Sequence, residues 1–165
     1  MNPAAEFDII VYGATGYTGR LVAEYLASHY GNRADGPKWA MAGRSLAKLE
    51  EVRDEIGAPA STPLVVANAD DSADLEAMCA RTRVVLTTVG PYQLYGEPLL
   101  KACVDAGTAY ADLCGEPVWM RQMIDKYHEA AKASGAHIAF SSGFDSIPFD
   151  LGVLMLQKEA VAKFG

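Results

Sequence analysis

Three evenly spaced glycines, Gly13, Gly16 and Gly19, join a short apolar run to a segment with helical periodicity. The run at residues 7–12 is apolar on both faces, as in a buried parallel strand, and apolar residues recur at helical spacing over residues 21–30. Gly13 allows a sharp turn, Gly16 leaves room for a phosphate beside the backbone, and Gly19 allows close helix–sheet packing. The helix N-terminus then offers free N–H groups and a favourable dipole to an anion. This context predicts a dinucleotide-binding turn rather than a merely tight strand-to-helix connection.

The alternation of strand-like runs and helical stripes continues along the chain. Five further strands are expected, at residues 39–42, 63–67, 83–89, 109–113 and 137–140. Ser45 and Ser72 are predicted to cap the helices that follow the second and third strands. About six strands separated by helices predict an α/β fold: a Rossmann doubly wound parallel sheet with helices on both faces and strand order 3-2-1-4-5-6.

The predicted domain organisation has two parts. Residues 1–150 are expected to form one NAD(P)-binding Rossmann domain of ordinary size. The apolar side of a last predicted helix carries Leu151, Leu154, Val161 and Phe164. Because little chain remains to cover that side, we expect residues 151–165 to begin a linker helix toward a substrate domain missing from this sequence. Association of two copies through this helix is the alternative.

Composition and charge exclude several classes of protein. The formal net charge of -7 argues against a nucleic-acid-binding surface, and the apolar runs are too short for a membrane span. The first residues do not resemble a secretory leader. The cysteines, Cys79, Cys103 and Cys114, form no Cys-x-x-Cys pair and the three histidines are dispersed, so neither a disulfide framework nor a metal site is predicted. A cytoplasmic protein with a small-molecule substrate is expected.

The end of the second predicted strand indicates which dinucleotide is preferred. A site for NAD places an acidic residue there to bind the ribose hydroxyls. This chain instead has Gly43, Arg44 and Ser45, followed by Lys48. Arg44 with Ser45, helped by Lys48, would hold a 2′-phosphate through charge-assisted hydrogen bonds, which favours NADP over NAD. Arg44 as a solvated loop charge and Ser45 as only a helix cap remain the alternative.

Other candidate contacts follow predicted strands, where ligands bind in open α/β sheets. Asp70 is placed near the adenine, residues 89–92 near the nicotinamide ribose and residues 141–148 beside the nicotinamide; plain turns are the alternative. The predicted cofactor-binding residues are Gly13, Thr15, Gly16, Tyr17, Thr18, Gly19, Gly43, Arg44, Ser45, Lys48, Asp70, Gly90, Pro91 and Tyr92. No catalytic residue is assigned, because the Tyr-x-x-x-Lys pattern is missing and Cys114 is expected to be a buried, inert thiol.

Several motifs together resemble the saccharopine dehydrogenase-like oxidoreductases, in particular the branch that includes trans-acting enoyl reductases. They are GATGYTGR at 13–20, AGRS at 42–45, VGPY at 89–92, YADLCGE at 110–116 and GFDSIP at 143–148. The resemblance implies an N-terminal NADP-binding domain of a protein more than twice this long. It also implies that the glycine turn holds the pyrophosphate, Gly-Arg-Ser the adenosine phosphate, and Gly-Pro-Tyr the nicotinamide side. N-acetyl-glutamyl-phosphate reductases share the turn but need a catalytic cysteine in a Gly-Cys-Tyr context, which this chain does not have.

The resemblance further implies a reaction class. The full-length protein would transfer a hydride between NADPH and a C=N or C=C bond of a small molecule or lipid precursor, and the segment alone is expected to be inactive. A module that senses NADP without turnover is the alternative from another class. A degenerate domain that binds no nucleotide is a third.

Overall fold

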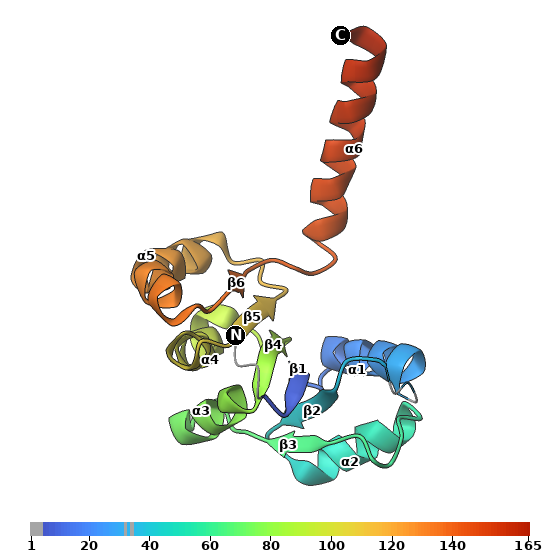
Figure 1. Ribbon diagram of the computed structural model, residues 1–165, viewed down its shortest axis with the longest axis vertical. Helices are drawn as coiled ribbons and strands as arrows, with labels where there is room; N and C mark the ends of the chain where they lie inside the picture. The colour runs from blue at the N-terminus through green and yellow to red at the C-terminus, as the bar shows by residue number, and fades with distance from the viewer. Residues whose placement is uncertain (1–4, 32, 34) are drawn as a thin grey trace.

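The computed structural model describes residues 5–31, 33 and 35–165, so residues 1–4, 32 and 34 of the predicted domain lie outside the described part. Six strands and six helices alternate along it (Figure 1). The strands are β1 (Phe7–Tyr12), β2 (Trp39–Gly43), β3 (Leu64–Val66), β4 (Thr82–Thr87), β5 (Ala109–Asp112) and β6 (Ile138–Ala139). The helices are α1 (Tyr17–Tyr30), α2 (Leu46–Glu55), α3 (Ser72–Ala80), α4 (Tyr92–Ala106), α5 (Pro117–Ser134) and α6 (Ile147–Phe164).

The strands form one parallel sheet in the order β3-β2-β1-β4-β5-β6, which confirms the predicted doubly wound sheet and its strand order. Side chains alternate between the two faces of a strand. In β1, Ile10 and Tyr12 belong to the core that includes α3, α4 and α5, whereas Val11 belongs to the core with α1 and α2. Figure 1 shows these two groups of helices on opposite faces of the sheet. Both faces of the central strands are therefore covered.

The register places the carboxyl ends of the central strands at one edge. Tyr12 at the end of β1 lies beside Ala42 of β2 and Thr87 of β4. The order of strands reverses between β1 and β4, because the chain builds outward through β2 and β3 first and through β5 and β6 afterwards. Ligands of open α/β sheets bind in the crevice at such a point.

Of the two predicted helix caps, the structure confirms one and corrects the other. Ser45 caps α2 as predicted, and its Oγ accepts a hydrogen bond from Lys48 N at 3.4 Å. The prediction for α3 was wrong by one residue: Asp71 is the cap, its Oδ1 accepts from Ala73 N at 2.9 Å, and Ser72 is already helical. A carboxylate at this position adds a favourable interaction with the helix dipole that a hydroxyl lacks.

The last helix, α6, extends away from the sheet and the other helices (Figure 1). It begins at Ile147, ahead of the predicted residues 151–165, and has no buried residue. Its large apolar side chains are exposed, among them Phe149, Leu151 and Leu154. Within the described residues, no helix combines the length and the apolar character that a membrane span requires.

Candidate functional site

The turn between β1 and α1 accepts only glycine at two of its three glycine positions. Gly13 has a φ of +87°, and a Cβ there would lie 2.8 Å from Val89 Cγ2 and 2.9 Å from Thr88 Oγ1. A Cβ on Gly19 would lie 2.1 Å from Gly13 O. The turn is tied to the sheet because Gly13 N donates to Ala42 O at 3.0 Å. Gly13 and Gly19 therefore shape the turn and seat α1 against it.

Gly16 has a different environment. A Cβ on Gly16 would meet Gly13 O at 3.4 Å, an ordinary contact. Gly16 is also the cap residue of α1, and among the described residues neither a side-chain cap bond nor an acidic residue occupies the first turn. The helix start therefore keeps backbone N–H groups and the positive end of its dipole available for an anion. A pyrophosphate group fits this arrangement because the missing side chain leaves space beside those N–H groups.

A cavity of about 440 Å³ opens at this turn. It lies at the carboxyl ends of β1, β2, β3 and β4, at the predicted crevice. Its lining includes seven of the predicted residues: Gly13, Thr15, Gly16, Gly43, Arg44, Asp70 and Gly90. Six further residues complete it: Tyr12, Asn68, Ala69, Thr88, Val89 and Tyr95. Of these six, only Val89 lies in a segment predicted to contact the cofactor, residues 89–92.

The remaining predicted residues lie around the cavity rather than in its lining. Tyr17 is 85% exposed on the first turn of α1, and Gly19 lies buried beneath the turn. Ser45 and Pro91 directly follow lining residues in the sequence, whereas Thr18 is two residues and Lys48 four residues beyond one. Their contacts with a cofactor stay predictions.

Tyr92 was predicted as a contact, but the structure places its side chain in the core. Its hydroxyl donates to Thr87 O at 3.2 Å and accepts from Leu113 N at 3.4 Å. Burial raises the pKa of Tyr92 to about 12. Tyr95, one helical turn later, lines the cavity instead and is 43% exposed. Residues three apart on a helix lie on the same side, so the spacing of the two tyrosines does not show which one lines the cavity.

Arg44 provides positive charge at the carboxyl end of β2. It is exposed, and the ion pairs of the described residues do not include it. An acidic residue at this strand end would bind ribose hydroxyls, whereas a guanidinium binds a phosphate through parallel hydrogen bonds. The donor set therefore fits a dinucleotide that carries a 2′-phosphate.

A buried carboxylate organises the neighbouring strand ends. Asp112 Oδ1 accepts from Cys114 N at 3.0 Å and from Ser141 N at 2.8 Å, and its Oδ2 accepts from Tyr110 Oη at 2.8 Å. Burial raises the pKa of Asp112 above its ordinary value, although these hydrogen bonds oppose the change. Ser141 has a φ of +53°, and its Oγ donates to Cys114 O at 2.7 Å. Asp112 thus joins the loops that follow β5 and β6.

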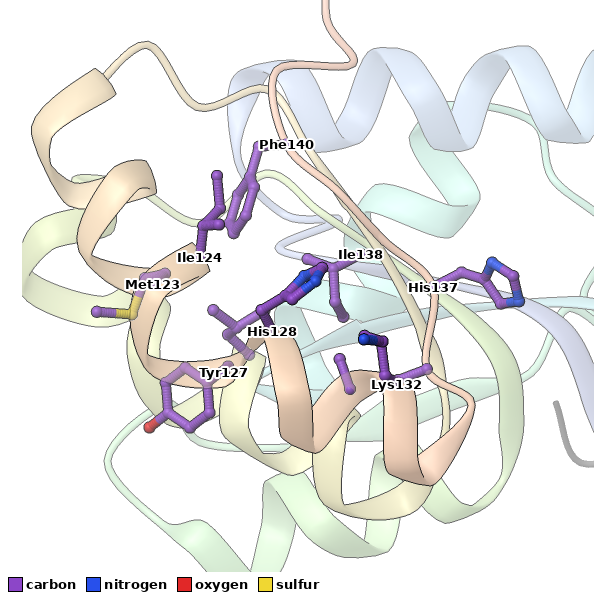
Figure 2. Close-up of a pocket in the computed structure, with 11 residues that line it drawn as sticks. Met123, Ile124, Tyr127, His128, Lys132, His137, Ile138 and Phe140 are labelled. Atoms are coloured by element: carbon purple, nitrogen blue, oxygen red, sulfur yellow. The ribbon is translucent and has the colours of Figure 1, made fainter.

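A second cavity, of about 410 Å³, lies at the far edge of the sheet between α5 and β6 (Figure 2). Apolar side chains such as Met123, Ile138 and Phe140 form most of its lining, with His128 and Lys132 of α5 among them. None of the predicted cofactor residues lines it. The glycine turn and the exposed arginine distinguish the cavity at β1–β4 as the candidate site.

Comparison with curated proteins gives close relatives. The trans-acting enoyl reductase of Mycobacterium tuberculosis (strain ATCC 25618 / H37Rv) is 52% identical over 163 residues, which cover 98% of this chain and 38% of the relative. The trans-acting enoyl reductase of Mycobacterium ulcerans (strain Agy99) is 51% identical over 156 residues, with coverages of 94% and 36%. The chain therefore spans less than two fifths of the length of these relatives.

Solved structures share the fold. Apo saccharopine dehydrogenase (L-Glu forming) from Saccharomyces cerevisiae superposes with a TM-score of 0.74 at 16% identity, covering 94% of this chain and 32% of that chain. Triphenylmethane reductase of Citrobacter sp., solved in complex with NADP(H), gives a TM-score of 0.57 at 22% identity, covering 81% and 48%. The family model described as saccharopine dehydrogenase NADP binding domain matches residues 9–138. By that match, which includes the glycine turn and Arg44, the chain belongs to the saccharopine dehydrogenase NADP binding domain family.

Proposed function

We propose that this chain binds NADPH in the cavity at the ends of β1–β4 and serves as the cofactor domain of an oxidoreductase. The observation that carries the proposal is the open position at Gly16, at a helix start without a side-chain cap, on the same cavity as Arg44. The lining at Gly16 thus suits a pyrophosphate, and the lining at Arg44 suits a 2′-phosphate. When bound, the nicotinamide supplies a hydride, and the protein supplies binding and orientation.

Each part of the cavity has a proposed role. The N–H groups at the start of α1 bind the pyrophosphate, and Arg44, with Ser45 and Lys48, binds the 2′-phosphate. Asp70 borders the adenine, because it follows β3 on the adenosine half of the sheet. Gly90 and Tyr95, which follow β4, form the nicotinamide side.

The relatives' name suggests the reaction class. Because they are named enoyl reductases, we propose reduction of a C=C bond of a small molecule or lipid precursor, ahead of a C=N bond. Substrate contacts are expected from protein outside residues 1–150, with α6 leading toward it. Since β6 is parallel to β1, α6 follows the same edge of the sheet at which the cavity lies. The chain alone is therefore expected to bind NADPH without turning over a substrate.

Titration of the purified chain with NADPH and NADH tests the cofactor assignment. Arg44→Ala is expected to weaken NADPH binding about 10- to 100-fold, the loss of a charge-assisted hydrogen bond, and to leave NADH binding unchanged. Arg53→Ala is the matched control, because Arg53 pairs with Asp54 on α2 and does not line the cavity. Equal losses for both nucleotides would refute the 2′-phosphate assignment. If millimolar NADPH fails to raise the melting temperature of the wild-type chain, the proposed function is wrong.

A further inference from the structure

Glu116 joins the first turns of two helices. It is the cap residue of α5, and its side chain extends to the start of α4. Glu116 Oε1 accepts from Tyr92 N at 2.8 Å, and Oε2 accepts from Gln93 N at 2.9 Å. Because the two oxygens bind two successive N–H groups, the carboxylate fixes both the position and the direction of the first turn of α4.

The first turn of α5, which follows Glu116, packs closely against α4. A Cβ on Gly96 of α4 would lie 2.6 Å from Trp119 Cζ2, so the two helices are in close contact one turn beyond Glu116. The rings of Tyr92 and Trp119 also pack with centroids 5.8 Å apart. Packed aromatic rings in a core resist displacement, because each shift costs many contacts. The backbone that carries Glu116 is therefore fixed by this packing, and its carboxylate binds the start of α4 from a defined position.

The first turn of α4 in turn positions one wall of the cavity. Gly90, which precedes it by two residues, and Tyr95, which follows three residues after Tyr92, both line the cavity, whereas Glu116 does not. A change in the direction of this turn would move both residues. Residues that follow β4 serve the nicotinamide half of a dinucleotide, and those that follow β1, β2 and β3 serve the adenosine half.

We propose that Glu116 is a positioning residue for the nicotinamide half of the cofactor site. This inference rests on the proposed function, since it presupposes that NADPH binds in the cavity. The carboxylate acts through the backbone of α4 and touches no part of the cofactor. Its effect is therefore expected at the wall formed by Gly90 and Tyr95, which lie on either side of the first residues of α4, rather than at Gly16 and Arg44, which follow β1 and β2.

The same two helices provide a matched control. Glu97 of α4 accepts a hydrogen bond from Tyr127 Oη of α5 at 2.8 Å and forms an ion pair with Lys126. Glu97 does not line the cavity. Glu97→Gln therefore weakens a carboxylate tie between α4 and α5 without changing the first turn of α4.

The experiment compares NADPH with 2′,5′-ADP, which carries the adenosine half alone. Dissociation constants are measured for the wild-type chain, Glu116→Gln and Glu97→Gln. We expect Glu116→Gln to bind NADPH about 5- to 30-fold more weakly, because ordering the first turn of α4 then costs binding energy up to about the worth of one charge-assisted hydrogen bond, and 2′,5′-ADP with unchanged affinity. Glu97→Gln is expected to bind both ligands as the wild type does. Equal effects of Glu116→Gln on both ligands, or none on NADPH, would overturn the positioning role.

The experiment also covers variants that fail to fold and a wild-type chain that fails to bind. If Glu116→Gln does not melt cooperatively, Glu116→Asp carries the same test, because its carboxylate is one methylene too short to bind both N–H groups. Failure of both variants to fold would assign Glu116 a structural role and overturn the proposal. If the wild-type chain binds neither NADPH nor 2′,5′-ADP, the proposed function fails before the role of Glu116 is reached.

Discussion

Gly16 and Gly19 lie three residues apart in one turn, yet a side chain has opposite consequences at the two positions. Valine at position 16 finds open space in the protein but occupies the place of the pyrophosphate. We expect Gly16→Val to fold, with a loss of about 1 kcal/mol for the poorer cap residue, and to lose NADPH binding. Valine at position 19 would bring Cβ to 2.1 Å from Gly13 O, so Gly19→Val is expected to lose about 3 kcal/mol or more.

Thermal unfolding and NADPH titration of the two variants measure this contrast. Alanine at each position serves as the smaller control, because Cβ alone already causes the clash at position 19. Undiminished NADPH binding by Gly16→Val would remove the pyrophosphate from this turn. A Gly19→Val variant as stable as the wild type would contradict the close packing of α1 on the turn.

At the scale of elements, Asp112 connects the end of β5 to the loops on either side. Asp112→Ala would leave Cys114 N, Ser141 N and Tyr110 Oη without their acceptor, so we expect a loss of about 2–4 kcal/mol in the free energy of unfolding. Asp112→Asn keeps one acceptor oxygen for the two N–H groups and is expected to lose less than about 1.5 kcal/mol. Urea denaturation measures both. Equal losses for the two variants would show that the hydrogen bonds do not account for the effect.

The strands and their order were predictable from the sequence, whereas the position of one helix cap was not. The six strands and their order were predictable because buried parallel strands are continuous apolar runs and the glycine turn marks β1. The cap of α3 was not, because Asp70, Asp71 and Ser72 are all good cap residues in succession. Choosing among them depends on where the chain leaves β3, which is a property of the folded sheet.

The candidate site likewise contains residues that the sequence identifies and residues that it does not. The glycines that shape the turn were identified from their spacing, because the backbone alone determines their role. The choice between Tyr92 and Tyr95 was missed, because it depends on the rotation of α4 about its axis. That rotation is set by Glu116 and by the contact of Gly96 with Trp119, both of which involve α5. No local pattern around either tyrosine carries that information.

At the scale of the whole molecule, α6 differs from the other helices because its apolar side chains are exposed to solvent and none of its residues is buried. Its exposed apolar residues are not confined to one stripe: they are Ile147, Phe149, Leu151, Val153, Leu154, Met155, Leu156, Val161 and Phe164. A helix that is apolar all round is typical of a protein interior, and contact between two copies along one stripe would leave its other sides exposed. The chain is therefore expected to form assemblies larger than a dimer.

Light scattering across a range of protein concentrations tests this expectation. The triple variant Leu151→Lys, Leu154→Lys, Val161→Lys is expected to be monomeric where the wild-type chain associates. Because all three side chains are exposed, its free energy of unfolding should stay within about 0.5 kcal/mol per substitution of the wild-type value. Its NADPH affinity should also be unchanged, since α6 does not line the cavity. A wild-type chain that remains monomeric at every concentration would contradict the prediction, because nine exposed apolar side chains on one helix would then be stable in water.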